Sequence, residues 1–163
     1  MRAADGEPTT TTFSTPSDRE LAVTRFFAAP PALVFDAWTS PARIKDWMLG
    51  PDGWTMPVCD VDLRAGGAWR FAWRGPDGTE LSMHGVYREV SPPERLVFTE
   101  AWGGDWPETL NTVVLAGEDD GTRLTCTVQF VSTGARAAAF STGMSQGMTQ
   151  SLDRLAEQLA ARA

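Results

Sequence analysis

A chain of 163 residues, 42% of them hydrophobic and 21% charged, has the size and composition of one globular domain. Its net charge of −7, with Lys45 as its only lysine, argues against a nucleic-acid surface and against adhesion to anionic membranes. No apolar run reaches the roughly 18 residues that a membrane-spanning helix needs, and residues 1–18 lack the apolar stretch of a secretory signal. We therefore expect a cytoplasmic protein that has neither a nucleic acid nor a membrane as its partner.

The cysteines and histidine offer no metal chemistry. Cys59 and Cys126 stand singly inside predicted strands, so we expect two buried free thiols rather than a disulfide. The sequence contains no CxxC, no HExxH and no cluster with metal-ligand spacing. It therefore predicts neither a metal nor another cofactor.

The first third of the chain predicts a tail, a strand and two short helices. Residues 1–18 lack periodicity and are expected to be a disordered tail, which leaves 19–163 as a single domain. An apolar, β-favouring run at 21–27 predicts the first strand. Proline is tolerated in a first helical turn, so helices are expected after Ala29-Pro30 and Ser40-Pro41, the second ending before Gly50-Pro51.

From residue 54 onward, β-favouring segments alternate with turn residues. This pattern is typical of an antiparallel meander. The predicted strands cover residues 54–63, 68–74, 80–90, 95–102, 109–116 and 122–131, with turns at Gly75-Pro76-Asp77-Gly78 and Gly103-Gly104-Asp105.

The last thirty residues, 134–163, predict one long helix that closes over this sheet. Apolar residues recur at steps of three and four and form a core-facing stripe: Phe140, Met144, Met148, Leu152, Leu155 and Leu159. Gly143 and Gly147 interrupt the helix at about 1 kcal/mol each relative to alanine. Either the helix packs closely on the sheet there, or a space beside it is kept open and walled by the two methionines.

Seven tryptophans are more than a core of this size requires. In the strand at 68–74, Trp69, Phe71 and Trp73 alternate with polar or small residues and therefore share one face. They form either plain core or the wall of a cavity. The cavity alternative gains weight because a curved sheet capped by one helix touches that helix only along a stripe.

Several segments taken together resemble a known family. They are Ala29-Pro30 with residues 34–38, 62–67 leading into Trp69-Arg70-Phe71, 74–78, 85–87, 92–98, Gly143-Met144, Gly147 and 151–155. Their order and spacing are similar to homologues of the activator of the 90-kDa heat-shock-protein ATPase, a branch of the START-like (SRPBCC, helix-grip) superfamily.

The resemblance implies an α+β helix-grip fold: a curved antiparallel sheet wrapped around a long C-terminal helix, with a deep apolar cavity between them. It also implies relatives that bind lipids, polyketides and other hydrophobic ligands, among them aromatase/cyclases and antibiotic-sequestering proteins. Two positions depart from the family pattern, because Met48 and Met148 stand where relatives often carry tryptophan. Pocket shape therefore cannot be copied from those relatives.

Polar residues offer few catalytic candidates. His84, the only histidine, could act as a general acid or base if it faced inward, and the sequence leaves its face open. Asp60 and Asp62 share a strand face, but salt bridges to Arg64 or Arg70 explain them more simply. Neither cysteine has a basic neighbour in sequence that would activate it as a nucleophile, so we assign no catalytic residue.

We therefore predict binding, carriage or sequestration of a small hydrophobic ligand, aromatic or polyketide-like, between the sheet and the C-terminal helix. The predicted ligand-binding residues are Trp47 at the mouth, and Trp54, Trp69, Phe71, Trp73, Met83, His84, Trp102, Met144 and Met148. The alternatives are a cyclase- or dehydratase-type enzyme using His84 and Asp62, and an interaction module with a protein partner related to chaperone activation. The oligomeric state is left open.

Overall fold

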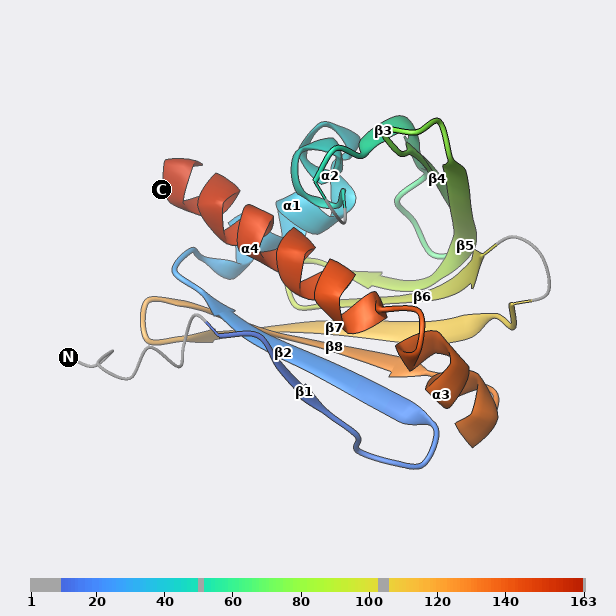
Figure 1. The fold of residues 1–163 in the computed structure, drawn as a ribbon. Coiled ribbons are helices and arrows are strands. Elements are labelled where there is room, and N and C mark those ends of the chain that lie inside the picture. Colours follow the sequence, from blue (N-terminus) through green and yellow to red (C-terminus); the bar gives the residue numbers. More distant parts are fainter. Residues whose placement is uncertain (1–9, 50–51, 103–105, 163) are drawn as a thin grey trace.

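The structure, a computed structural model, describes residues 10–49, 52–102 and 106–162 (Figure 1). The strands are β1 (Thr12–Ser14), β2 (Glu20–Phe27), β3 (Thr55–Val61), β4 (Ala68–Arg74), β5 (Glu80–Ser91), β6 (Arg95–Trp102), β7 (Thr109–Glu118) and β8 (Gly121–Gln129). The helices are α1 (Pro31–Thr39), α2 (Pro41–Trp47), α3 (Thr133–Phe140) and α4 (Met144–Arg162). No helix among these residues is long and apolar enough to span a membrane.

All eight strands belong to one antiparallel sheet in the order β1-β2-β8-β7-β6-β5-β4-β3. The predicted meander from β3 to β8 is confirmed, and β2 joins it by pairing with β8. The register shifts between Thr55 and Val58, and again between Tyr87 and Glu89. Such irregularities bend and twist the strands, and the sheet curls into the half-open wall visible in Figure 1.

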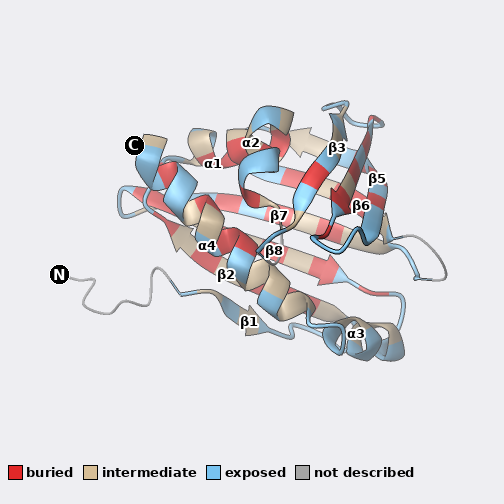
Figure 2. Cartoon of the chain, turned by 45° about the horizontal axis from the view of Figure 1, so that its top comes forward, coloured by how far each residue is buried: buried red, intermediate tan, exposed pale blue. Residues whose placement is uncertain are grey.

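The helix α4 crosses the concave side of this sheet, and α1 and α2 close one end between α4 and β3 (Figure 1). Buried and exposed residues alternate along the strands, and α4 buries one side only (Figure 2). Its buried apolar residues are Leu152, Leu155 and Leu159. This confirms the α+β helix-grip fold with its long C-terminal helix.

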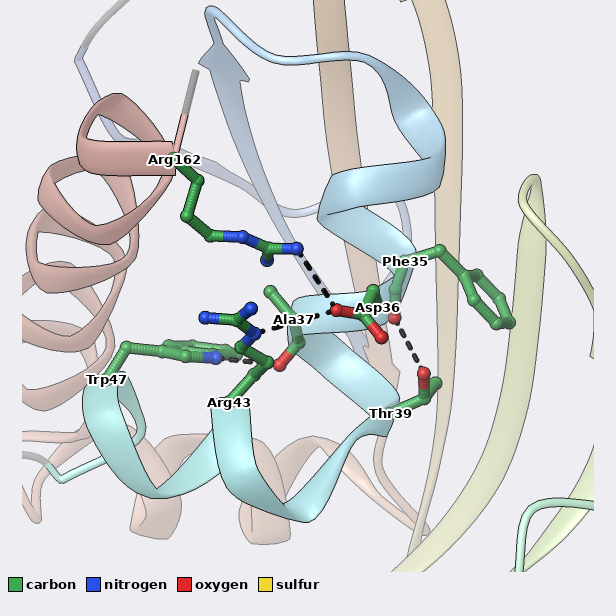
Figure 3. A network of polar contacts seen from close by, with 7 residues as sticks. All are labelled: Phe35, Asp36, Ala37, Thr39, Arg43, Trp47 and Arg162. Atoms are coloured by element: carbon green, nitrogen blue, oxygen red, sulfur yellow. Dashed lines mark hydrogen bonds and ion pairs between the residues drawn. The ribbon is translucent and has the colours of Figure 1, made fainter.

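Ion pairs hold the C-terminal half of α4 in place. Arg162 contacts Asp36 of α1 at 3.3 Å (Figure 3). Asp153 pairs with Arg25, an inward-facing residue of β2 whose side chain is only 6% exposed. A buried guanidinium without a partner would be strongly destabilising, so this pair fixes α4 against β2. The C-terminal half of α4 is therefore tied to both β2 and α1.

Two predictions about the chain ends are wrong in part. Residues 12–14, assigned to the disordered tail, form an edge strand that pairs with β2. The single helix predicted at 134–163 is two helices: α3 ends at Phe140, and Gly143, with φ +84°, lies in the turn just before α4. Only glycine takes such a backbone conformation without strain. The turns predicted at 50–51 and 103–105, the tail residues 1–9 and residue 163 lie outside the described residues.

Gly85 of β5 allows an unusually close approach inside the sheet. A Cβ at this position would lie 1.8 Å from the Thr99 carbonyl oxygen and 2.7 Å from Trp69 Nε1. Trp69 of β4 pairs with Gly85 and reaches across β5 to Phe98 of β6, with ring centroids 5.7 Å apart at 89°. The missing side chain therefore lets one tryptophan bridge three strands.

We predict that Gly85→Ala lowers the free energy of unfolding by at least about 2 kcal/mol. The added methyl group meets backbone, which cannot move aside as a flexible side chain can. Chemical denaturation monitored by circular dichroism measures the change.

Gly147→Ala in α4 is the matched control, since a Cβ there meets no atom within 4 Å. It should stabilise the protein by about 0.5–1 kcal/mol through helix propensity. Equal effects of the two substitutions would contradict the close approach at Gly85.

Candidate functional site

A continuous set of aromatic rings covers the concave side of β4, β5 and β6. Trp69, Phe71 and Trp73 are all buried, as their alternation in β4 predicts. Their centroids lie 4.8 Å apart for Trp69 and Phe71, and 6.0 Å apart for Phe71 and Trp73. Phe98 and Tyr87 extend the set at 6.2 Å from each other. We call the concave side of β4–β6 the aromatic face.

Trp102 ends the aromatic face and remains accessible. Its ring stacks on Trp73 with centroids 5.6 Å apart and planes 19° apart, yet the residue is 37% exposed. Met83, its neighbour across the strand pair, is buried. The half-buried Trp54 comes just before β3, and its ring packs against Gly75. Trp102 is therefore the most accessible ring of the aromatic face.

The N-terminal half of α4 is packed more loosely than its C-terminal half. Met144 and Met148 are half-buried against the core, whereas Leu152, Leu155 and Leu159 are buried. Open space surrounds the Cβ position of Gly147. Close packing therefore does not explain this glycine. Phe140, predicted to begin the buried stripe, is 36% exposed because it belongs to α3 beyond the helix break.

Two predicted ligand-binding residues lie elsewhere. Trp47 is 2% exposed and sits in the core, not at a mouth: its Nε1 donates to the Ala37 carbonyl at 2.8 Å (Figure 3), and its ring contacts Trp38 at 5.0 Å. His84 is exposed on the convex side, because it alternates with the buried Met83 and Gly85. Because His84 points to the convex side, it is not part of the candidate site.

Glu100 is the polar residue that sequence reasoning missed. In β6 it lies two residues from Phe98 and two from Trp102, so its side chain shares their side of the strand and belongs to the aromatic face. Its Oε2 accepts a hydrogen bond from Trp102 Nε1 at 2.9 Å. The pairs His84–Ala101 and Tyr87–Phe98 place it across from Gly85. The same alternation, read in the sequence, would have found it.

The surroundings of Glu100 disfavour its charged form. Burial raises the pKa of this carboxyl from 4.5 to about 7, against the smaller, opposing effect of the Trp102 hydrogen bond. No ion pair in the described part of the chain includes it. The side chain is nevertheless only half-buried, so a ligand can reach it. An acid that titrates near neutral pH therefore lies on an aromatic surface.

Neighbouring polar groups of β7 lie beside Glu100. Thr109 is its partner across the strand pair, and Asn111 donates to the Thr109 hydroxyl at 3.0 Å. Cys126 of β8 lies within electrostatic range, and its pKa rises to about 12 through burial and the charge of Glu100. This end of the concave side is thus polar, whereas the β4 end is aromatic.

The remaining chemical candidates have structural roles. Asp62 pairs with Arg64 at 2.9 Å, as predicted, and both residues are exposed. Cys59 and Cys126 are free thiols, as expected, and burial raises the pKa of Cys59 to about 11. Such thiols are poor nucleophiles. No group of three potential metal ligands occurs among the residues that the structure describes.

Two buried indole N–H groups lack a hydrogen-bond partner. They belong to Trp38 and to Trp69. A buried donor without an acceptor costs about 1–3 kcal/mol. The Trp69 group lies over Gly85 on the aromatic face.

Two hollows in the described structure lie away from the aromatic face. One is a gap of about 10 Å³ between α1, α2 and α4, and the other is an open depression of about 510 Å³ beside the β5–β6 turn. The depression is lined by Pro31, Pro93, Glu94, Arg95, Val114, Leu115, Ala116 and Gly117. An enclosed cavity on the aromatic face therefore stays a prediction.

Residues 28–160 match the model of the family described as Activator of Hsp90 ATPase homolog 1-like protein. The chain belongs to this family. No curated protein matches the sequence. The predicted resemblance, including membership of the START-like superfamily, is confirmed.

Solved structures of similar proteins agree with the fold. A protein from Rhodobacter sphaeroides is 32% identical, with a TM-score of 0.88 over 93% of this chain and 98% of its own. The AHSA1 protein from Silicibacter pomeroyi is 26% identical, with a TM-score of 0.73 over 88% of this chain and 99% of its own. These likenesses support a ligand-binding or activator-type domain and leave the ligand unassigned.

We predict that Glu100→Gln stabilises the protein increasingly as pH rises. The folded state holds the Glu100 proton more tightly than the unfolded state, so the wild type loses stability as pH rises from the unfolded pKa of 4.5 through about 7. Glutamine does not titrate. The difference in unfolding free energy should grow by about 1–3 kcal/mol between about pH 5 and pH 8.

Denaturant titrations at several pH values measure this difference. Glu108→Gln, at an exposed carboxylate, controls for the change in net charge. A constant difference for Glu100→Gln across this range would mean that the carboxyl is freely hydrated.

Proposed function

We propose that this family member binds a small hydrophobic ligand, aromatic or polyketide-like, and carries or sequesters it. The ligand would lie on the aromatic face, beneath the N-terminal half of α4. Trp102, Met144 and Met148 would supply its accessible walls, and Trp69, Phe71 and Trp73 the base. The observation that carries the proposal is the open space at Gly147, beside two half-buried methionines.

The energetics favour a flat apolar ligand. Burying apolar surface contributes about 25 cal/mol per Å² before the cost of ordering is subtracted. Methionine side chains adjust their shape to different partners, which suits a wall that admits ligands of varied outline. The accessible Trp102 ring stacks on Trp73 and offers its edge and remaining face to an aromatic ligand.

An enzyme of the cyclase or dehydratase type is the second candidate, and Glu100 is the observation that favours it. Its carboxyl titrates near neutral pH on the face proposed for the ligand, which suits transfer of a proton. His84 and Asp62 cannot share this role, because one lies on the convex side and the other pairs with Arg64 in solvent. Turnover abolished by Glu100→Gln would favour this candidate over simple carriage.

The activator-type alternative has less support from the convex side. Val86 and Val114 are exposed there, but they stand on β5 and β7, which β6 separates. Single exposed apolar side chains are ordinary on protein surfaces.

Ligand binding is tested by quenching of tryptophan fluorescence with a panel of naphthalene, anthracene and polycyclic phenol probes. We predict micromolar-range quenching by at least one probe, and a loss of about tenfold or more in affinity for Gly147→Leu, whose side chain fills the proposed space.

Gln150→Leu places the same side chain on the exposed surface of α4 and is the matched control. It should bind as the wild type does, with both variants folded by circular dichroism. No quenching by any probe, or equal binding by the two leucine variants, would contradict the proposal.

A further inference from the structure

No described cation pairs with the carboxylate on the aromatic face. The Glu100 carboxylate accepts a hydrogen bond from Trp102 and belongs to none of the ion pairs in the described residues. Arg25, the cation on the concave side of β2, is already neutralised by Asp153. A carboxylate in partly desolvated surroundings gains most from a cation that arrives with the ligand.

Aromatic rings beside this carboxylate suit a cation as well. Trp73 and Trp102 stack next to each other, and Trp102 is accessible and hydrogen-bonded to Glu100 Oε2. The face of a tryptophan ring attracts an ammonium group through its negative quadrupole. The net charge of −7 also attracts a cationic ligand over a longer range.

We propose that the aromatic face selects a hydrophobic ligand that carries a protonated amine, with Glu100 as the residue that recognises the ammonium group. The ammonium would lie against the Trp102 ring and pair with the Glu100 carboxylate, while the apolar part covers the rings of β4. This inference rests on the proposed binding function and names the chemical class of its ligand. Glu100 is a specificity-determining residue in this account.

The test compares two probes that share ring and linker, 1-naphthylmethylamine and 1-naphthalenemethanol. They differ mainly in one charge, so the ratio of their Kd values isolates the contribution of the ammonium group. We expect the wild type to bind the amine about tenfold more tightly. In Glu100→Gln this ratio should fall to about one, and in Glu108→Gln, which removes an exposed carboxylate, it should stay as in the wild type.

The outcomes separate this inference from the function on which it rests. If the alcohol binds but the wild type shows no preference for the amine, the amine proposal is overturned and hydrophobic binding stands. The same holds if Glu100→Gln keeps the preference. If both Glu100→Gln and Glu108→Gln lose it, the general negative field is responsible, and Glu100 is not the recognising residue. If neither probe nor any other aromatic probe binds, both proposals fail together.

Discussion

The ion pair between Arg25 and Asp153 fixes where the long helix can lie, and the rest of the site depends on that position. Arg25 faces inward from β2 and is nearly inaccessible, so its charge needs a partner above it. Asp153 supplies that partner from α4, and Arg162, at the C-terminal end of the same helix, contacts Asp36 of α1. These contacts hold the C-terminal half of α4 close to β2, α1 and α2, and leave its first turns without comparable anchors among the described contacts.

One helix held this way cannot cover a sheet of eight strands. On β4 to β6, the strands farther from β2, large aromatic side chains cover the concave side by packing on one another. Gly85 lets Trp69 reach Phe98 across β5. The rings at the base of the face pack on one another, and Trp73 Nε1 also donates to the carbonyl of Met48, just after α2, at 2.8 Å. At its accessible edge, Trp102 and Glu100 stay within reach of a ligand. The combination of rigid rings, pliable methionines and one desolvated carboxyl is what the proposals about function depend on.

Regular alternation and turn chemistry made most of the fold predictable from the sequence. The bounds of β4 and β6 agree with prediction, because each is flanked by turn residues and alternates cleanly. The break at residues 141–143 was missed because helical periodicity continues through it, and only the backbone conformation of Gly143 reveals the turn between the two helices. The edge strand β1 was missed because an edge strand of three residues carries too little pattern to distinguish it from a tail.

The site was predictable where a face could be assigned, and not where contacts beyond the strand decide. Trp69, Phe71 and Trp73 were correctly grouped by period two alone. Trp47 was misplaced because a tryptophan near a helix end fits a pocket mouth and a core equally well, until Trp38 and the Ala37 carbonyl are seen to enclose it. His84 was chosen for its chemical reactivity. Glu100 would have been found from its position on β6, on the same face as Phe98 and Trp102.

The most direct measurement of the central claim uses the indole N–H resonances of the seven tryptophans in a ¹H–¹⁵N spectrum, assigned with single Trp→Phe variants. During titration with a neutral naphthalene probe, we expect saturable shifts of the Trp102 and Trp73 resonances, with those of Trp38 and Trp47 nearly unchanged. Shifts confined to Trp38 and Trp47, or no shift at any indole, would contradict a ligand site on the aromatic face.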